Sequence, residues 1–368
     1  MADSGGDRGV EEILNNHNFD FLNLITNDDY EDSDPDFTMS PYTNLSINCS
    51  YSDLLNLKTN SDILNVLSLN IQSLPAKFNE FLDFLEELKN KNNSPDVVCL
   101  QEIWQTDNEN LFKIAGYHLP IFKNRTLHKG GGVAIYIKSS LTYKILPELS
   151  IFSERIFESL FIESITKDNK SIAIGTVYRP GTPVPGMNFT EQFTNFAELL
   201  THTLNGLNDN YEKSYIYGDI NLDVLKVKQN KFISEYIDTL CAFGFLQIVT
   251  KPTRITKESA TIIDHILTNN PQDGDSIAIL CNTVSDHLPI LHCIDLQTDK
   301  IKPPSEYVTR DFSAQKFLSF NNALSSFTWN HTLTIQDTQL AYDAFNATFT
   351  DLYNTYFPPI TKNLIKGM

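Results

Sequence analysis

The feature that most constrains the fold is a succession of short apolar segments with few helical segments between them. The apolar segments are rich in β-branched and aromatic residues, which is typical of buried strands. Strands are expected at residues 63–71, 96–102, 132–138, 158–164, 171–178, 214–219, 261–269, 277–281 and 288–296. Helical spacing of apolar residues occurs between them, at 77–90, 190–204 and 231–243. Many strands and few helices predict two sheets that pack together and are covered by helices.

The two ends of the chain differ from this centre. Residues 1–60 are rich in Asp, Asn and Ser without a sustained period, which predicts a disordered acidic tail. After about Lys302, leucine and aromatic residues recur three and four positions apart, which predicts amphipathic helices that pack on a neighbouring domain. We therefore expect a tail at 1–60, a folded domain at 61–298 and a helical segment at 299–368.

The composition narrows the class of protein. A hydrophobic content of 41% and a charged content of 20% are typical of soluble globular chains. No apolar run approaches the roughly 20 residues that span a bilayer, and the acidic start lacks the order of a signal peptide. The five cysteines form no CxxC pair, which argues against disulfides and a zinc cluster. We therefore expect a protein that is not secreted and has no membrane partner.

The net charge of −18 argues against a nucleic-acid-binding protein, whose surface is usually basic. Residues 1–36 carry −10 of this charge, so the objection is weaker for the rest of the chain. No sequence feature indicates an obligate protein partner.

Polar residues stand at or just past the ends of the expected strands, where a sheet edge opens to solvent and ligands bind. They are one Tyr, two Asn, four carboxylates and one His: Asn70, Glu102, Tyr178, Asp219, Asn221, Asp264, Asp286 and His287. Each has an ordinary explanation as a cap, a turn residue or a surface group. Their shared position favours a common site over coincidence.

Such a set suits the hydrolysis of a phosphate ester. Oxygen ligands without clustered His or Cys favour magnesium or manganese over zinc. A divalent ion can neutralise charge on the phosphate while a base takes the proton of the attacking water. A Ser-His-Asp hydrolase is disfavoured because Ser285 lies two residues from His287 and in no nucleophile elbow. The chain also lacks a GxxxxGK[ST] nucleotide-binding loop.

The segments "LNIQSL", "CLQEIW", "VYRPG", "YGDINLD", "IIDHIL" and "SDHLPI" follow one another in this order. In this the chain resembles the endonuclease/exonuclease/phosphatase superfamily over about residues 61–298. The resemblance implies a deoxyribonuclease I-like four-layer α/β/β/α sandwich of two mixed sheets, with the site at one end of the sheets.

Within the superfamily, "LSLNIQSLPAKFNE", "GGGVAIYIK" and "KPTR…SATIIDHILTNN" are most similar to the endonuclease domain of non-LTR (LINE-type) retrotransposons. Residues 303–368 resemble the segment that joins this domain to a reverse transcriptase. The chain has no Tyr/Phe-x-Asp-Asp polymerase signature, so the transcriptase is expected only in a full-length element.

The resemblance implies a metal site and a catalytic group. Glu102 would be the main ligand of Mg²⁺, with Mn²⁺ as the alternative ion, Asn70 nearby and Asp286 assisting. His287, oriented by Asp264, would act on the scissile phosphate. The remaining assignments are Asp219 for positioning or deprotonating the water, Asn221 for phosphate oxygens, and Tyr178 for the phosphate or the leaving group. Both His287 and Asp219 stay candidates for the base.

Contacts with duplex DNA are expected from basic residues. The loop 122–132 carries Arg125 and Lys129, and Arg179 and Arg254 follow later in the chain. Ser285 is also expected among the DNA-binding residues, where it would orient the loop beside His287. Ordinary solvated charges remain the alternative interpretation for each basic residue.

The expected function is metal-dependent nicking of duplex DNA, in the nucleus at the site of action and otherwise in the cytoplasm. An inositol phosphatase is disfavoured because Asp223 stands where such enzymes usually carry Arg. A repair apurinic endonuclease is the closer rival, although this chain has "TRITKESATII" where repair enzymes have an aromatic-rich stretch. An inactive truncated copy that serves only as a binding module is the third possibility.

Overall fold

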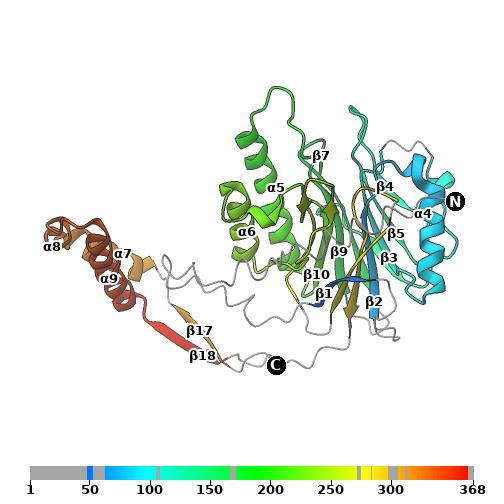
Figure 1. The fold of residues 1–368 in the computed structure, drawn as a ribbon. Coiled ribbons are helices and arrows are strands. Elements are labelled where there is room, and N and C mark those ends of the chain that lie inside the picture. Colours follow the sequence, from blue (N-terminus) through cyan, green and yellow to red (C-terminus); the bar gives the residue numbers. More distant parts are fainter. Residues whose placement is uncertain are drawn as a thin grey trace. The chain divides into compact units, whose positions relative to one another are not determined.

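The computed structural model describes residues 48–52, 63–104, 108–165, 171–271, 275–282, 284–296, 306–310 and 314–363 (Figure 1). The described residues belong to two compact units, one up to residue 296 and the other from residue 306 onward. Apart from residues 48–52, the expected acidic tail lies outside the described residues.

The first large sheet of the larger unit has seven strands and mixed direction. Its β1–β15 and β2–β3 pairs are parallel and its other pairs are antiparallel. In spatial order the strands are β1 (Asn48–Ser52), β15 (Ser276–Leu280), β16 (Ile290–Asp295), β2 (Ile63–Asn70), β3 (Val97–Gln101), β5 (Val133–Ile137) and β4 (Ile121–Lys123).

The second large sheet is also mixed, because β9 and β10 run parallel while their outer neighbours are antiparallel. In spatial order its strands are β11 (Leu246–Gln247), β14 (Asp264–Thr268), β10 (Ser214–Asp219), β9 (Ser171–Tyr178), β8 (Phe157–Ile165) and β6 (Thr142–Ile145), with β7 (Phe152–Ser153) also paired to β8. A separate hairpin consists of β12 (Arg254–Ile255) and β13 (Ala260–Thr261).

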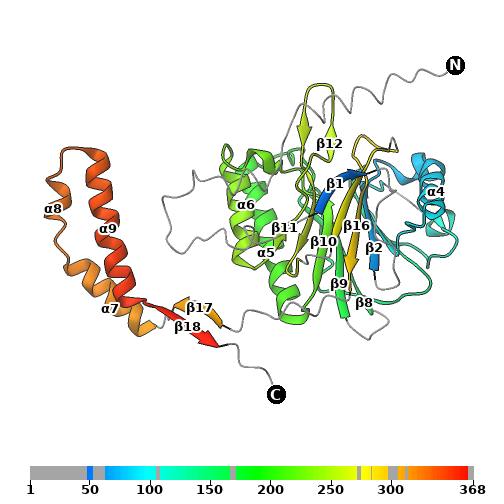
Figure 2. The ribbon, with the colours of Figure 1, turned by 60° about the horizontal axis from the view of Figure 1, so that its bottom comes forward.

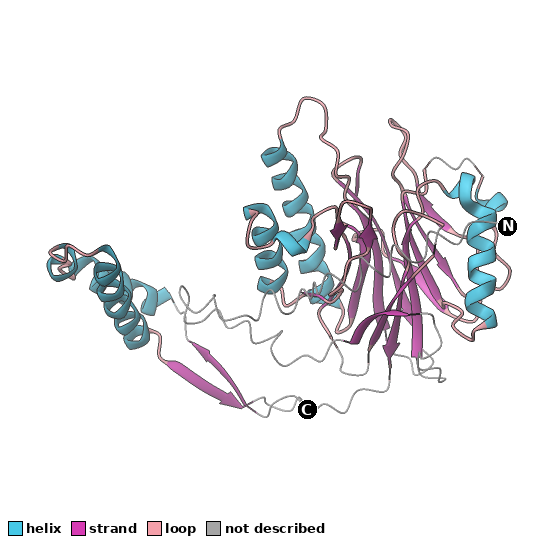
Figure 3. Ribbon diagram, in the orientation of Figure 1, coloured by secondary structure: helices cyan, strands magenta, loops and turns pink. Residues whose placement is uncertain are grey.

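The two sheets face each other, and helices cover their outer faces (Figures 1 and 3). Helix α4 (Leu74–Asn90) lies on the first sheet, and α5 (Phe189–Asn210) and α6 (Lys231–Ala242) lie on the second. The described residues of this unit also form two short 3-10 helices, η1 (Glu109–Phe112) and η2 (Val224–Lys226). The expected four-layer α/β/β/α sandwich of two mixed sheets is confirmed.

Helix α4 shows how local sequence builds one outer layer. The hydroxyl of Ser73 accepts a hydrogen bond from the amide of Ala76 at 3.4 Å and caps the helix. Phe81, Leu85 and Leu88 recur at helical spacing and are buried against the first sheet, as the periodicity predicts.

Strand β1 departs from the expectation of disorder over residues 1–60. It pairs in parallel with β15 from Asn48↔Ser276 to Ser52↔Leu280, and Cys49 is buried. The hydroxyl of Tyr51 donates to the carbonyl of Pro252 at 2.9 Å. A polar pentapeptide has no local period, and its partner strand lies far along the chain, so local pattern could not identify it.

The smaller unit contains the helices expected after Lys302, namely α7 (Ala314–Ser326), α8 (Asn330–Leu333) and α9 (Thr338–Tyr356). Phe320 of α7 is buried and contacts the rings of Phe349, Tyr353 and Phe357. The antiparallel pair β17 (Glu306–Arg310) and β18 (Pro359–Asn363) was not expected from the sequence. Figure 2 shows these elements from a second direction.

Among the helices in the described part of the chain, none combines the length and the apolar character that a membrane span requires.

Candidate active site

Strand register brings the polar strand ends to one edge of the sandwich. In the first sheet the parallel pair β2–β3 ends at Asn70↔Gln101, with Glu102 next in the chain. In the second sheet the parallel pair β9–β10 ends at Tyr178↔Asp219. Asp264 begins the antiparallel strand β14 directly opposite Asp219. The pairing alone therefore aligns residues that are far apart in the sequence.

Hydrogen bonds join the two sheets at this edge. Asn70 donates its amide nitrogen to Glu102 Oε1 at 3.0 Å and to Asp219 Oδ2 at 2.9 Å. The hydroxyl of Tyr178 donates to the same Oε1 of Glu102 at 2.8 Å. Since carboxylates only accept, the amide nitrogen of Asn70 must face them, and its oxygen accepts from the amide of Gln72. Asn70 is thus placed here as a bridge between two carboxylates.

Asn221 holds Asp219 from the other side. Its backbone amide donates to Asp219 Oδ1 at 3.0 Å, and its side-chain nitrogen donates to Asp219 Oδ2 and to the carbonyl of Arg179, both at 2.9 Å. Its φ of +52° is a left-handed conformation that is uncommon for a residue other than glycine. Both amide hydrogens are used within the protein, so Asn221 positions Asp219 and leaves only its side-chain oxygen for a ligand.

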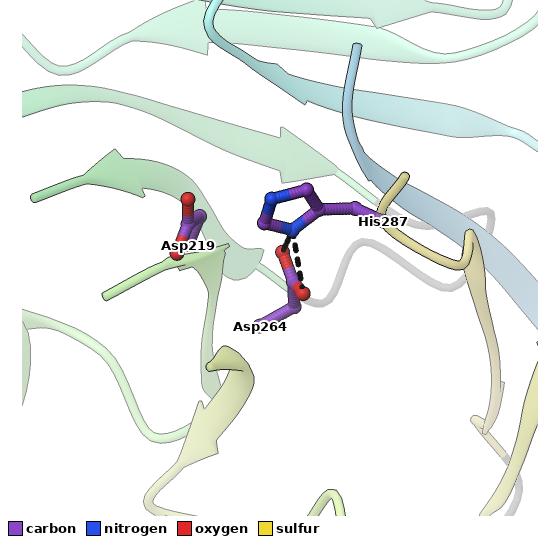
Figure 4. Close-up of side chains that lie close together, drawn as sticks. All are labelled: Asp219, Asp264 and His287. Carbon is purple, nitrogen blue, oxygen red and sulfur yellow. Dashed lines mark hydrogen bonds and ion pairs between the residues drawn. The ribbon is translucent and has the colours of Figure 1, made fainter. Parts of the chain in front are cut away.

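A His-Asp dyad lies beside Asp219 (Figure 4). His287 Nδ1 lies 2.9 Å from each carboxylate oxygen of Asp264, and all three side chains are buried. The hydroxyl of Thr253 donates to Asp264 Oδ2 at 2.7 Å. Ligand atoms of Asp219, Asp264 and His287 lie within 4.8 Å of one another. Asp264 accepts the Nδ1 proton, so Nε2 is the ring atom left to face a substrate.

The electrostatics of the site follow from burial and close carboxylates. Burial lowers the pKa of His287, but Asp264 and then Asp219 and Asp286 raise it more, to about 9. Burial raises the pKa of Asp219, and the charge of Asp264 adds to this rise. Burial and the charge of Glu102 raise the pKa of Tyr178, so it remains a neutral phenol that can donate a hydrogen bond.

Two residues of the loop before β16 contact His287 from the exposed side, and Asp286 Oδ1 lies 4.0 Å from His287 Nε2. Asp286, expected to assist at the metal, is exposed and pairs with Arg254, whose Nε lies 3.0 Å from Asp286 Oδ2. Arg254 in turn is engaged by this carboxylate and is only partly free for DNA. The hydroxyl of Ser285 accepts from the amide of His287 at 3.3 Å, a contact that shapes the loop carrying the imidazole.

Two of the arginines expected to contact DNA are buried. Arg179 is 2% exposed, packs over the rings of Phe189 and Phe196, and donates to the carbonyl of Ile220. Burial also lowers its pKa to about 10. A guanidinium enclosed under α5 cannot lie along a DNA backbone, so the expectation for Arg179 is wrong.

Arg125 is likewise held inside the protein. Its side chain is 8% exposed, its Nε donates to the fully buried carboxylate of Glu158 at 2.5 Å, and its guanidinium lies 5.8 Å from the ring centroid of Tyr178. Lys129 in the same loop is exposed. From the sequence, Arg125 and Lys129 are equivalent cations of one loop. The tertiary structure distinguishes them, because only Arg125 forms an ion pair with a buried carboxylate.

Three residues with contacts at this edge were not singled out from the sequence. Thr253 bonds Asp264, Glu158 anchors the loop before β5, and Trp104 donates its Nε1 to Glu102 Oε2 at 3.5 Å. Trp104 stands in the "CLQEIW" segment and Thr253 in "KPTR", so both lie inside recognisable motifs. Glu158 gives only a weak signal, as an acid at the start of an apolar strand.

Residues 67–287 match the model of the endonuclease/exonuclease/phosphatase family. No curated protein sequence matches the chain.

Solved structures are similar to this chain at low sequence identity. The 3'-5' exonuclease NExo from Neisseria meningitidis is 16% identical with a TM-score of 0.46, over 62% of this chain and 98% of that one. The AP endonuclease LMAP from Leishmania major is 14% identical with a TM-score of 0.49, over 65% and 89%. The endonuclease domain of TRAS1, a telomere-specific non-LTR retrotransposon, is 14% identical with a TM-score of 0.46, over 64% and 99%.

The matched residues make up more than half of the 368-residue chain and contain both the Glu102–Asn70–Asp219 network and the His287–Asp264 dyad. The chain therefore belongs to the endonuclease/exonuclease/phosphatase family, whose members are hydrolytic nucleases and phosphatases that generally use divalent metals.

Proposed function

We propose that this protein is a divalent-metal-dependent endonuclease that nicks duplex DNA by hydrolysing a phosphodiester bond. The observation that carries the proposal is the bridge made by Asn70, which joins Glu102 and Asp219 from two sheets beside the His287–Asp264 dyad. A carboxylate for a metal and a buried acid-base pair then lie within reach of one phosphate.

The donor set fits magnesium or manganese. Glu102 is half-buried, and its Oε2 accepts only the long bond from Trp104 among the interactions of the described residues. We assign the metal to Glu102, with Asp219 beside it, because carboxylate oxygens are the ligands these ions prefer. Asn70 turns its nitrogen to both carboxylates, and Asp286 pairs with Arg254 and lies 4.0 Å from His287 Nε2, so we assign neither of them as a metal ligand. When bound, the ion would neutralise charge on the phosphate oxygens.

Three side chains of the site have separate roles in the hydrolysis. His287, tied to Asp264 through Nδ1, presents Nε2 to the scissile phosphate. Asp219, held by Asn70 and Asn221, orients the attacking water and accepts its proton. The hydroxyl of Tyr178 donates its single hydrogen to Glu102, and on DNA binding this hydrogen would turn to the phosphate or the leaving oxygen. His287 as the base is the competing assignment.

The family includes phosphatases, and Asp223 argues against a phosphate-rich headgroup as the substrate. Its carboxylate accepts from the amides of Leu225 and Ile262 and lies 3.4 Å from Lys226. The position two residues after Asn221 therefore carries a carboxylate held by the protein, and it offers no cation to an additional phosphate.

The sequence segments shared with LINE-type endonucleases support a role in target-primed retrotransposition. In that setting the enzyme acts in the nucleus on chromosomal duplex DNA, and the segment 299–368 precedes a reverse transcriptase in a full-length element. The ion is then Mg²⁺, with Mn²⁺ able to replace it.

The test is a plasmid nicking assay. We expect purified protein to convert supercoiled plasmid to open circles with magnesium or manganese and to be inactive with EDTA. Glu102→Gln keeps the size of the side chain but removes the charge, and should abolish nicking while circular dichroism stays unchanged. Nicking by pure protein without a metal would refute the proposed mechanism.

A further inference from the structure

Trp104 is an exposed aromatic residue at the rim of the active site. It is 43% exposed, whereas Tyr178 on the opposite sheet is 7% exposed. Its Nε1 donates to Glu102 Oε2 at 3.5 Å, so the indole lies against the carboxylate assigned to the metal. Within the described part of the chain, no other aromatic ring packs on it. A large apolar face is therefore open beside the reacting phosphate.

The backbone holds Trp104 in an unfavourable conformation. Its φ is +60°, and that of Glu102 is +51°, both in the left-handed region that bulky residues rarely adopt. The amide of Trp104 donates to the carbonyl of Gly131 at 2.8 Å. The amide of Ile103 donates to the carbonyl of Gly132 at 3.3 Å. Strain of this kind persists where the surrounding structure imposes it and concentrates at functional sites.

A glycine segment, Gly130–Gly132, forms the support beneath Trp104. All three glycines have positive φ, between +65° and +81°. A side chain at residue 131 would collide with the guanidinium of Arg125. The amide of Gly132 donates to the buried Glu158 at 2.7 Å, which ties the segment to the second sheet. These contacts fix the backbone that supports the indole. The exposed Lys129 directly precedes the glycine segment.

We propose that Trp104 is a nucleotide-stacking residue that binds the base next to the scissile phosphate. This inference rests on the proposed endonuclease function and specifies how the DNA is held. A π face accepts any base, so stacking adds affinity with little sequence preference of its own. A base inside a regular duplex is covered by its neighbours, so Trp104 selects DNA that unstacks easily, at flexible or mismatched steps.

Binding can be measured without cleavage, in EDTA. The chain has two tryptophans, Trp104 and Trp329, so a Trp329→Phe protein reports on Trp104 alone. The affinity of this background protein is compared with that of the wild type first. We expect its fluorescence to be quenched on addition of a short duplex with one central mismatch, and less by the fully paired duplex.

Two substitutions in this background separate stacking from the contact with Glu102. Trp104→Ala removes both and leaves no tryptophan, so its binding is followed by the fluorescence anisotropy of a dye-labelled duplex; it should weaken binding of the mismatched duplex about tenfold, equivalent to about 1.4 kcal/mol. Trp104→Phe loses the Nε1 donor but keeps an aromatic face, and should bind within about threefold of the parent. Circular dichroism checks that both variants fold. Equal loss in the two variants would overturn the stacking role.

The plasmid assay distinguishes the two proposals. A protein that nicks with magnesium but shows neither quenching nor a loss of affinity in Trp104→Ala refutes the role of Trp104 and leaves the nuclease intact. A protein that shows the quenching and the loss of affinity but never nicks supports the stacking site and refutes the endonuclease.

Discussion

At the scale of single residues, Asn70 decides how the site is assembled. One amide group donates to carboxylates on two different sheets, at 3.0 Å to Glu102 and 2.9 Å to Asp219. Without this shared donor the two like charges would face each other in a poorly solvated place, which is unfavourable. The strand end therefore carries Asn because the position needs two donors and no charge.

The His287–Asp264 dyad gives a graded prediction. His287→Ala removes the group that faces the phosphate and should lower the nicking rate at least about a hundredfold. Asp264→Asn only loosens the orientation of the imidazole and should cost less. Single-turnover nicking at saturating magnesium measures both.

His128→Ala is the matched control, since this imidazole is exposed and contacts Glu154 instead. It should nick like the wild type. If the two dyad variants also retain full activity, the assignment of the site to this edge is wrong.

At the scale of elements, the loop between β4 and β5 contains two cations with different environments. Arg125 is paired with a fully buried carboxylate, so Arg125→Ala leaves Glu158 buried and unpaired. We expect it to lower the free energy of unfolding by about 3–5 kcal/mol. Lys129→Ala should leave stability unchanged, weaken DNA binding at all sequences, and reduce the salt dependence by about one phosphate contact.

Chemical denaturation and binding at several salt concentrations separate the two effects. An Arg125→Ala protein as stable as the wild type would show that the ion pair contributes nothing to folding. A Lys129→Ala protein with an unchanged salt slope would remove this lysine from the DNA path.

The β12–β13 hairpin bears on the choice between retrotransposon and repair enzyme. Residues 254–261 contain no aromatic side chain, and Arg254 at its base is bound to Asp286. A repair enzyme needs residues that wedge into the duplex and a pocket for a base-less sugar. We therefore expect nicks in undamaged duplex, with at most a modest preference for an abasic site.

The measurement uses one labelled duplex with and without a single abasic analogue, under equal conditions. Cleavage confined to the abasic position by about a thousandfold, the scale of specific recognition, would identify a repair enzyme instead.

At the scale of the whole molecule, strand β1 extends the folded unit toward the N-terminus. A fragment of residues 61–298 lacks this strand, exposes the edge of β15 and loses the buried Cys49. We expect it to unfold at least roughly 4 °C below a fragment of residues 39–298, since a loss of about 2 kcal/mol has this effect in a domain of such size.

Both fragments contain every residue of the site, from Asn70 to His287, so both should nick plasmid at low temperature. Thermal unfolding followed by circular dichroism compares them. Equal midpoints would mean that β1 contributes no stability.

Local sequence pattern predicts the apolar strands of the two large sheets and the polar residues at their ends, but not the short strands β1, β4, β6, β7 and β11. Burial on a strand or a helix face is a local property, so "VVCLQ" and "SYIYGD" predict β3 and β10 from their own residues. The same holds for the buried face of α4. The ordered motifs at these strand ends carry the resemblance to the family.

Which of these groups become neighbours depends on the tertiary structure. Asn70 and Asp219 are 149 residues apart and become neighbours through the packing of two sheets. The charge of a residue does not reveal whether it is buried, so the sequence predicts Arg125 and Arg179 as surface cations. In the structure Arg125 pairs with the buried Glu158, and Arg179 packs against aromatic rings of α5. Strand β1 likewise forms only because it pairs with β15, which lies far along the chain. Contacts between distant segments depend on how sheets stack, and no local pattern encodes that stacking.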